Sequence, residues 1–265
     1  MGTFFKLIFI FLVTSCTSII YQPDKYMHAD PKSLGISYDE FVVPSLDKTQ
    51  LVAWNLKSKT ANPENLILMF HGNAENMSSH FLNLAWMTEN KSDLLIFDYR
   101  GYGLSSGTPY PRGVAEDGLK FLEVAYAQFK DRHYKRFIVY TQSLGGAIAL
   151  RSIEDFKFKD EISLLVLDST FRDPQTVARI KTNWPMSRLI SADYTANKKL
   201  SAITMPTLVI HSTQDPVIPF ECGKELYDLI PAKSKWLWTL NEIGHGDVFF
   251  IKARKYRQDF LHLLR

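Results

Sequence analysis

Three residues that together could perform nucleophilic chemistry each follow an apolar run in this chain of 265 residues. Ser143 comes directly after "FIVYTQ", Asp215 follows "TLVIHSTQ", and His245 follows "WLWTLNEIG". A serine hydroxyl is a weak nucleophile until a histidine takes its proton, and a carboxylate that orients the histidine supports that transfer. The three residue types therefore predict attack on a carbonyl group, provided that the fold brings them together.

The elements that must position these residues follow from hydrophobic patterning. Uninterrupted apolar runs of four to eight residues, bounded by turns, are typical of strands covered on both faces. We expect strands at Ser37–Val43, Gln50–Leu56, Leu66–Phe70, Leu94–Phe97, Phe137–Tyr140, Ile162–Leu167, Thr207–Ile210 and Lys235–Leu240. Helical patterns lie between them, at Met77–Thr88, Val114–Phe129, Gly146–Ile153, Phe220–Leu229 and Val248–Leu264. This alternation predicts an α/β fold, a mainly parallel, doubly wound sheet of eight strands.

Polar motifs stand where these strands end, which is where ligands bind in such sheets. They are "HGNAEN" (His71–Asn76), "DYRGYG" (Asp98–Gly103), "TQSLGG" (Thr141–Gly146), "DST" (Asp168–Thr170), "HSTQDPVIP" (His211–Pro219) and "GHGD" (Gly244–Asp247). The glycine pair after Ser143 predicts a sharp turn in which strand and helix approach closely, with the start of the helix aimed at developing negative charge.

With serine, aspartate and histidine in this order along the chain, the sequence resembles the α/β-hydrolase superfamily, in its serine-aminopeptidase-like and acyl-protein-thioesterase-like branches. The resemblance extends from about Ile36 to the C-terminus. It implies that Ser143 is the nucleophile, His245 the general base and Asp215 its orienting partner. It also implies an oxyanion hole made by the backbone N–H groups of Leu144 and Asn73.

Three features leave alternatives open. Thr141 stands where the family's G-x-S-x-G motif usually has glycine, so either the local packing adapts or activity is low. Asp168 also ends a strand and is a second candidate for the orienting acid. His71 and His211 follow strands as well, and we expect both to have structural roles.

A cap insertion of two or three short helices is expected over the site, at about residues 169–204. Its apolar residues either line an acyl-binding pocket or dock the cap on the domain. They are Trp184, Met186, Leu189, Ile190 and Tyr194.

The first residues resemble a bacterial lipoprotein signal. Lys6 precedes a short apolar run that is too short to span a bilayer, and "LVTSC" places small residues before Cys16. The resemblance implies that residues 1–15 are removed and that Cys16 receives lipid; an uncleaved anchor or a plain signal peptide is the alternative. We expect residues 16–33 to be a polar tether and residues 34–265 to be the hydrolase domain.

Composition and motifs exclude other classes. The net charge of +3 is small and evenly spread, which argues against nucleic-acid binding. Neither a metal-ligand spacing nor a nucleotide-binding motif occurs, so we expect no metal and no cofactor. We therefore predict a serine hydrolase of carboxylic esters or thioesters that acts on a small-molecule or acyl-chain substrate. Its expected location is the bacterial envelope, at the periplasmic face of the outer membrane. A peptidase of the same fold and an inactive envelope-binding lipoprotein are the alternatives.

Overall fold

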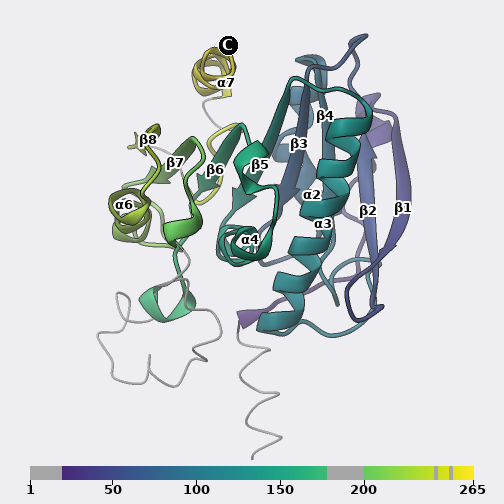
Figure 1. The fold of residues 1–265 in the computed structure, drawn as a ribbon, viewed down its shortest axis with the longest axis horizontal. Coiled ribbons are helices and arrows are strands. Elements are labelled where there is room, and N and C mark those ends of the chain that lie inside the picture. Colours follow the sequence, from purple (N-terminus) through teal and green to yellow (C-terminus); the bar gives the residue numbers. More distant parts are fainter. Residues whose placement is uncertain (1–19, 178–199, 242–243, 251–252) are drawn as a thin grey trace, which may run out of the picture.

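The computed structural model describes residues 20–177, 200–241, 244–250 and 253–265. Its centre is an eight-stranded sheet in the order β1-β2-β4-β3-β5-β6-β7-β8 (Figure 1). The first two neighbouring pairs are antiparallel and the other five are parallel, which confirms the predicted mainly parallel sheet. The strands are β1 (Tyr38–Pro44), β2 (Gln50–Leu56), β3 (Asn65–Phe70), β4 (Ser92–Phe97), β5 (Arg136–Gln142), β6 (Leu164–Asp168), β7 (Thr207–Ser212) and β8 (Lys235–Leu240).

Helices cover both faces of the sheet, because alternate residues of each buried strand point to opposite sides. Leu66, Leu68 and Phe70 of β3 pack in one cluster with α3 (Pro111–Asp131), α4 (Leu144–Asp155) and α6 (Phe220–Leu229). Ile67 and Met69 pack in the other. That second cluster includes α2 (Met77–His80), the 3-10 helices η2 (Phe81–Asn83) and η3 (Ala85–Glu89), and α7 (Ala253–Leu263). None of the helices within the described ranges combines the length and apolar character that crossing a bilayer requires.

The other 3-10 helices of the described residues are η1 (Pro31–Leu34), η4 (Lys159–Glu161) and η7 (Leu200–Ala202), and Leu200 of η7 packs in the first cluster. In the main layers α6 matches its predicted range at both ends, and α3 begins three residues earlier than predicted. The early start suits Pro111, because proline is tolerated in the first helical turn, where its missing N–H has no partner to lose.

The segment after β3 differs from the single helix expected over Met77–Thr88. One α-helical turn, α2, is followed by the two 3-10 helices, which are separated at Leu84, where φ is −118°. Just before it, the amide of Asn83 donates to Oε1 of Gln142 over 2.8 Å. This bond holds the segment against the end of β5, next to Ser143.

Residues 20–34 differ from the polar tether that we expected over residues 16–33. Tyr21 is 2% exposed and belongs to the hydrophobic core, and Pro23 forms an isolated parallel bridge with Glu75. A freely solvated tether would leave the ring of Tyr21 in water, so burying it favours the packed arrangement. The domain therefore includes the described residues before position 34.

We expect Tyr21→Ala to lower the free energy of unfolding by about 3 kcal/mol, because deleting a buried aromatic ring leaves a cavity. Urea denaturation measures the change. Tyr26 lies on the same segment and is 71% exposed, so Tyr26→Ala is the matched control and should change stability by less than about 0.5 kcal/mol. Equal, small effects of the two substitutions would contradict the packing of this segment.

Candidate active site

Ser143 occupies a sharp turn between β5 and α4 at the carboxyl edge of the sheet. Its φ is 52° and its ψ −121°, a conformation that is uncommon for a residue other than glycine. The backbone N–H of Ser143 donates to the carbonyl of Asp168 over 2.9 Å, which ties the turn to the end of β6. A Cβ at Gly145 would lie 2.3 Å from the carbonyl oxygen of Phe70, so only glycine allows α4 to begin this close to β3.

Thr141, the departure from the usual glycine, is accommodated by the neighbouring strand. Its side chain is fully buried, and its hydroxyl donates to the carbonyl of Val166 in β6 over 2.9 Å. A buried hydroxyl with such a partner does not pay the cost of an unsatisfied polar group. The packing around the turn therefore adapts to threonine, which was one of the two alternatives.

His245 and Asp215 are brought together by the loops after β8 and β7. Nδ1 of His245 donates to Oδ2 of Asp215 over 2.8 Å, and the other carboxylate oxygen accepts N–H groups from Val217 and Ile218, both at 2.8 Å. Burial acts to raise the pKa of Asp215, but the bond from His245 together with these two N–H groups lowers it below its ordinary value. The Asp215 side chain is thus a buried carboxylate, while that of His245 is 19% exposed and open to a reactant.

The loop of His245 is bonded to the residue that precedes Ser143. Nε2 of Gln142 donates to the carbonyl of Gly246 over 3.2 Å. Ser143 and His245 thus each lie one residue away from the same hydrogen bond. In this way the structure gathers the three residues that the sequence singled out at one edge of the sheet.

The two groups expected to form the oxyanion hole also lie at this edge. Leu144 is the first residue of α4, where backbone N–H groups have no partner inside the helix. Asn73 follows β3, whose end touches the start of α4 at Gly145. The side chain of Asn73 accepts from the hydroxyl of Tyr102 over 2.8 Å, so this turn is held from outside the site.

The N-terminal segment supports the same turn, a contact that we did not predict. The Asn73 amide donates to the carbonyl of Ile20 over 2.6 Å, and its oxygen accepts the N–H of Gln22 over 3.0 Å. The Asn76 amide donates in the same way to the carbonyl of Tyr26 over 2.7 Å. The available sequence signal was the apolar run Ile19, Ile20 and Tyr21 within a mostly polar stretch.

Asp168, the second candidate acid, has other partners. Its carboxylate accepts from the hydroxyl of Tyr140 over 2.5 Å and from that of Ser169 over 3.0 Å. Burial raises the pKa of Asp168 to about 6, although these two bonds act in the opposite direction. In the structure Asp215, rather than Asp168, is hydrogen-bonded to His245.

The raised pKa of Asp168 makes stability depend on pH. The ordinary value is 3.8, so the folded protein keeps this proton to higher pH than the unfolded chain. Asp168 therefore costs stability above about pH 6, and the cost fades as the pH falls toward 4. We expect Asp168→Asn to raise the free energy of unfolding, relative to the wild type, more at pH 8 than at pH 5. The surface substitution Asp228→Asn is the control, and a difference for Asp168→Asn that is independent of pH would contradict the expectation.

The remaining polar residues at this edge hold loops. His71 is fully buried, with Nδ1 2.8 Å from the carbonyl of Gly72 and Nε2 3.4 Å from Oδ1 of Asp98. His211 is also fully buried, and its Nε2 donates to the carbonyl of Ile218 over 3.0 Å. These contacts agree with structural roles for both histidines.

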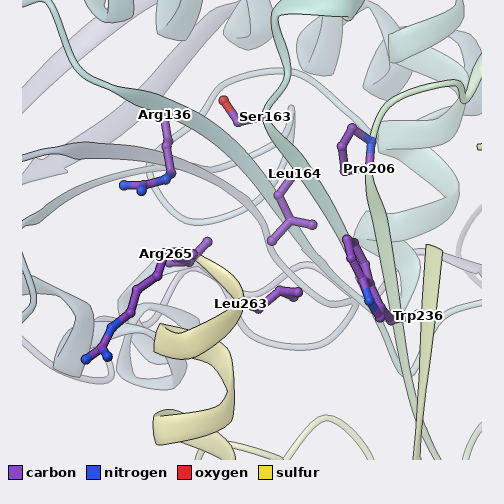
Figure 2. Close-up of a pocket in the computed structure, with 8 residues that line it drawn as sticks. Arg136, Ser163, Leu164, Pro206, Trp236, Leu263 and Arg265 are labelled. Atoms are coloured by element: carbon purple, nitrogen blue, oxygen red, sulfur yellow. The ribbon is translucent and has the colours of Figure 1, made fainter. Parts of the chain in front are cut away.

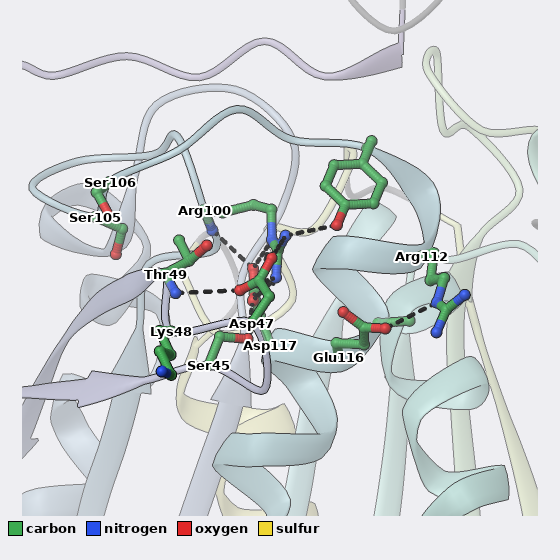
Figure 3. Close-up of polar contacts among 12 residues, drawn as sticks. Ser45, Asp47, Lys48, Thr49, Arg100, Ser105, Ser106, Arg112, Glu116 and Asp117 are labelled. Carbon is green, nitrogen blue, oxygen red and sulfur yellow. Dashed lines mark hydrogen bonds and ion pairs between the residues drawn. The ribbon is translucent and has the colours of Figure 1, made fainter.

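Arg100, in the motif "DYRGYG" that follows β4, binds the β1–β2 turn to α3. Its guanidinium is bonded to Asp117 and Asp47, each at a closest approach of 2.7 Å, and to the hydroxyl of Tyr110 over 2.9 Å (Figure 3). These bonds join three separate segments around a buried cation. They give Arg100 a structural role that requires no part in catalysis.

The other features considered as possible sites are metal-binding clusters and a cavity away from Ser143. No group of three or more His, Cys, Asp or Glu side chains in the described ranges could hold a metal ion. A cavity of about 250 Å³ lies between Arg136, Leu164, Pro206, Trp236 and Arg265 (Figure 2). It is formed at the amino ends of β5 to β8, the edge of the sheet opposite to Ser143. Residues 178–199, with the expected cap residues Trp184 to Tyr194, lie outside the described residues, as does Cys16.

Known proteins have similar sequences and a similar fold. The family described as serine aminopeptidase, S33, matches residues 61–182. YfhR of Escherichia coli O157:H7 is 31% identical over 259 residues, which cover 92% of this chain and 88% of YfhR. The esterase Pf2001 of Pyrococcus furiosus superimposes with a TM-score of 0.72 at 18% identity, over 92% of this chain and 98% of its own. The chain belongs to one family with YfhR, and its fold is that of the α/β hydrolases.

The chain also resembles a monoglyceride lipase from Saccharomyces cerevisiae, with a TM-score of 0.66 and 18% identity over 86% of this chain and 94% of the lipase. At such identities the solved structures show a common fold.

Proposed function

We propose that the protein hydrolyses carboxylic esters or thioesters through an acyl-enzyme on Ser143. The observation that carries the proposal is the 2.8 Å bond between His245 and Asp215, on a loop that is itself bonded to the residue before Ser143. An imidazole held in this way presents Nε2, unprotonated, as the base for the serine hydroxyl. The esterase and the lipase with similar folds support an ester as substrate.

Acylation begins when Oγ of Ser143 attacks the carbonyl carbon and Nε2 of His245 takes the hydroxyl proton. Asp215 keeps the imidazole in the required tautomer and stabilises the imidazolium that forms. The backbone N–H groups of Leu144 and Asn73 donate to the oxyanion. His245 then gives its proton to the departing alcohol or thiol, and the acyl group stays on Ser143.

Deacylation repeats these steps with water as the nucleophile. His245 takes a proton from the water as it attacks the acyl carbon, and the same two N–H groups hold the second oxyanion. Collapse of this intermediate, with His245 returning its proton to Oγ of Ser143, releases the carboxylic acid and restores the serine. These reaction steps need no metal or cofactor, because the protein's own groups carry both the proton and the negative charge.

A fluorophosphonate reagent tests the proposal directly. We expect one label per protein molecule, mapped by mass spectrometry to the peptide that contains Ser143, and hydrolysis of p-nitrophenyl esters. Comparing acyl chains of two to sixteen carbons, as oxygen esters and as thioesters, would define the substrate class. The absence of both labelling and turnover would contradict the proposal and favour a protein that only binds envelope components.

A peptidase is the second candidate, because the matching family is described as serine aminopeptidase. An amide has a poorer leaving group, so the same site would then need to bind and protonate an amine. Turnover of aminoacyl p-nitroanilides at a rate similar to that of esters would favour this candidate.

We also propose that Cys16 carries lipid and anchors the protein in the bacterial envelope, at the periplasmic face of the outer membrane. The support is the sequence "LVTSC" after a short apolar run. Mass spectrometry of protein expressed in bacteria should show an N-terminal Cys16 with the mass of added acyl chains, and the protein should partition into detergent. An intact Met1, or cleavage elsewhere without lipid, would contradict the anchor.

A further inference from the structure

Gly246, the residue after His245, is held by hydrogen bonds on both sides of its backbone. Its N–H donates to Oγ of Ser169 over 3.0 Å. Its carbonyl accepts from Nε2 of Gln142 over 3.2 Å. Ser169 is 1% exposed and Gln142 7% exposed, so water does not compete freely for either bond. The peptide groups next to His245 are therefore fixed from the ends of β6 and β5.

The bond from Ser169 has a fixed direction because the serine hydroxyl is itself oriented. Its hydrogen is donated to Oδ1 of Asp168 over 3.0 Å, which leaves the lone pairs of Oγ for the N–H of Gly246. Asp168 is held in turn by the Tyr140 hydroxyl. This chain of groups runs from β5 through β6 to the His245 loop.

The amide of Gln142 is oriented in a similar way. Its oxygen accepts from the Asn83 amide over 2.8 Å and lies 3.0 Å from Nδ1 of His80. With Oε1 occupied on that side, Nε2 faces the carbonyl of Gly246. A Cβ at Gly246 would lie 2.1 Å from Nε2 of Gln142, and the φ of Gly246 is +70°, so glycine is needed for this approach.

We infer that Ser169 and Gln142 are positioning residues that keep the His245 imidazole in register with both Asp215 and Ser143. The inference rests on the proposed function. Among the described residues, the side chain of His245 is hydrogen-bonded to Asp215, and its loop lacks regular secondary structure from residue 244 to 247. The two hydrogen bonds to Gly246, from Ser169 and Gln142, form a clamp that supplies a second constraint. Misplacing a catalytic group by about 1 Å costs on the order of 100-fold in rate.

The test is steady-state kinetics of Ser169→Ala and Gln142→Met on a short p-nitrophenyl ester. Alanine removes the acceptor for the Gly246 N–H, and methionine keeps the length of glutamine but removes the donor to the Gly246 carbonyl. We expect each variant to lower kcat by about 10- to 100-fold, with KM within twofold and with complete, slower fluorophosphonate labelling at Ser143. The matched control is Ser152→Ala, which removes a buried hydroxyl of α4 that donates to Ala115 and Ile148; its kcat should stay within twofold.

The split between kcat and KM separates positioning from general loss of stability. A displaced His245 imidazole slows the chemical step without changing how the ester binds, so kcat falls while KM stays within twofold. A purely structural effect would instead reduce the amount of protein that the fluorophosphonate can label.

The outcomes are distinguishable. Wild-type labelling and turnover, together with clamp variants that keep kcat within twofold, would overturn this inference and leave the proposed function standing. Absence of labelling and turnover in the wild type would overturn both. A loss of kcat that Ser152→Ala reproduces would also overturn the inference, because it would reflect the general loss of a buried hydrogen bond.

Discussion

Ser143→Ala is expected to abolish fluorophosphonate labelling and to lower kcat for an ester by about 10⁴- to 10⁶-fold. The substitution removes the oxygen that forms the covalent bond and leaves the backbone of the turn in place. The measurements are intact-mass analysis after labelling and initial rates at saturating substrate.

Ser152→Ala serves as the control, because Ser152 is a buried serine of α4 on the side away from the turn, bonded to the carbonyls of Ala115 and Ile148. It should keep both labelling and turnover. Undiminished labelling of Ser143→Ala would show that another residue is the nucleophile.

Asp215→Asn is expected to lower kcat by about 10⁴-fold while KM and the melting temperature barely move. The asparagine oxygen can still accept the N–H groups of Val217 and Ile218, so the loop keeps its bonds. Its amide nitrogen would then face Nδ1 of His245 as a second donor, and the imidazole would adopt the wrong tautomer.

Asp168→Asn is the matched comparison, since both carboxylates are buried at the ends of neighbouring strands. It should keep at least a tenth of the rate, a barrier increase of about 1.4 kcal/mol at most. Initial rates of the two variants on the same ester show which aspartate orients His245. If Asp168→Asn were the more damaging substitution, the orienting acid would be Asp168.

The sheet was largely predictable from the sequence because its central strands are buried on both faces. Runs such as "LILMF" in β3 and "FIVY" in β5 have no polar interruption, which is typical of a strand of a parallel sheet covered on both faces. The region of η2 and η3 was not predictable, since over so few residues an apolar spacing of three to four does not distinguish an α-helix, with about 3.6 residues per turn, from a 3-10 helix, with about 3.0. In that region the hydrogen bond from Asn83 to Gln142 helps to hold η2 against the end of β5.

The positions of Ser143, Asp215 and His245 were predictable because each follows a strand, and parallel strands end at one edge. The contacts that support these three residues could not be predicted. Ser169 and Gly246 are 77 residues apart in sequence, and Gln142 and Gly246 are 104 apart. Hydrogen bonds between such distant loops leave no periodic or local pattern. The roles assigned to the three residues stay predictions until the substitutions above are measured.

The packing of residues 20–28 decides where a shortened, recombinant form of the protein should begin. A version cut at residue 34, where the sequence suggested that the domain starts, would lose the partners of the Asn73 and Asn76 amides and leave a cavity in place of Tyr21. It would purify with lower stability and with a loosened turn beside Ser143, and its weak activity would be mistaken for a property of the enzyme. Expression should therefore start upstream of Ile20.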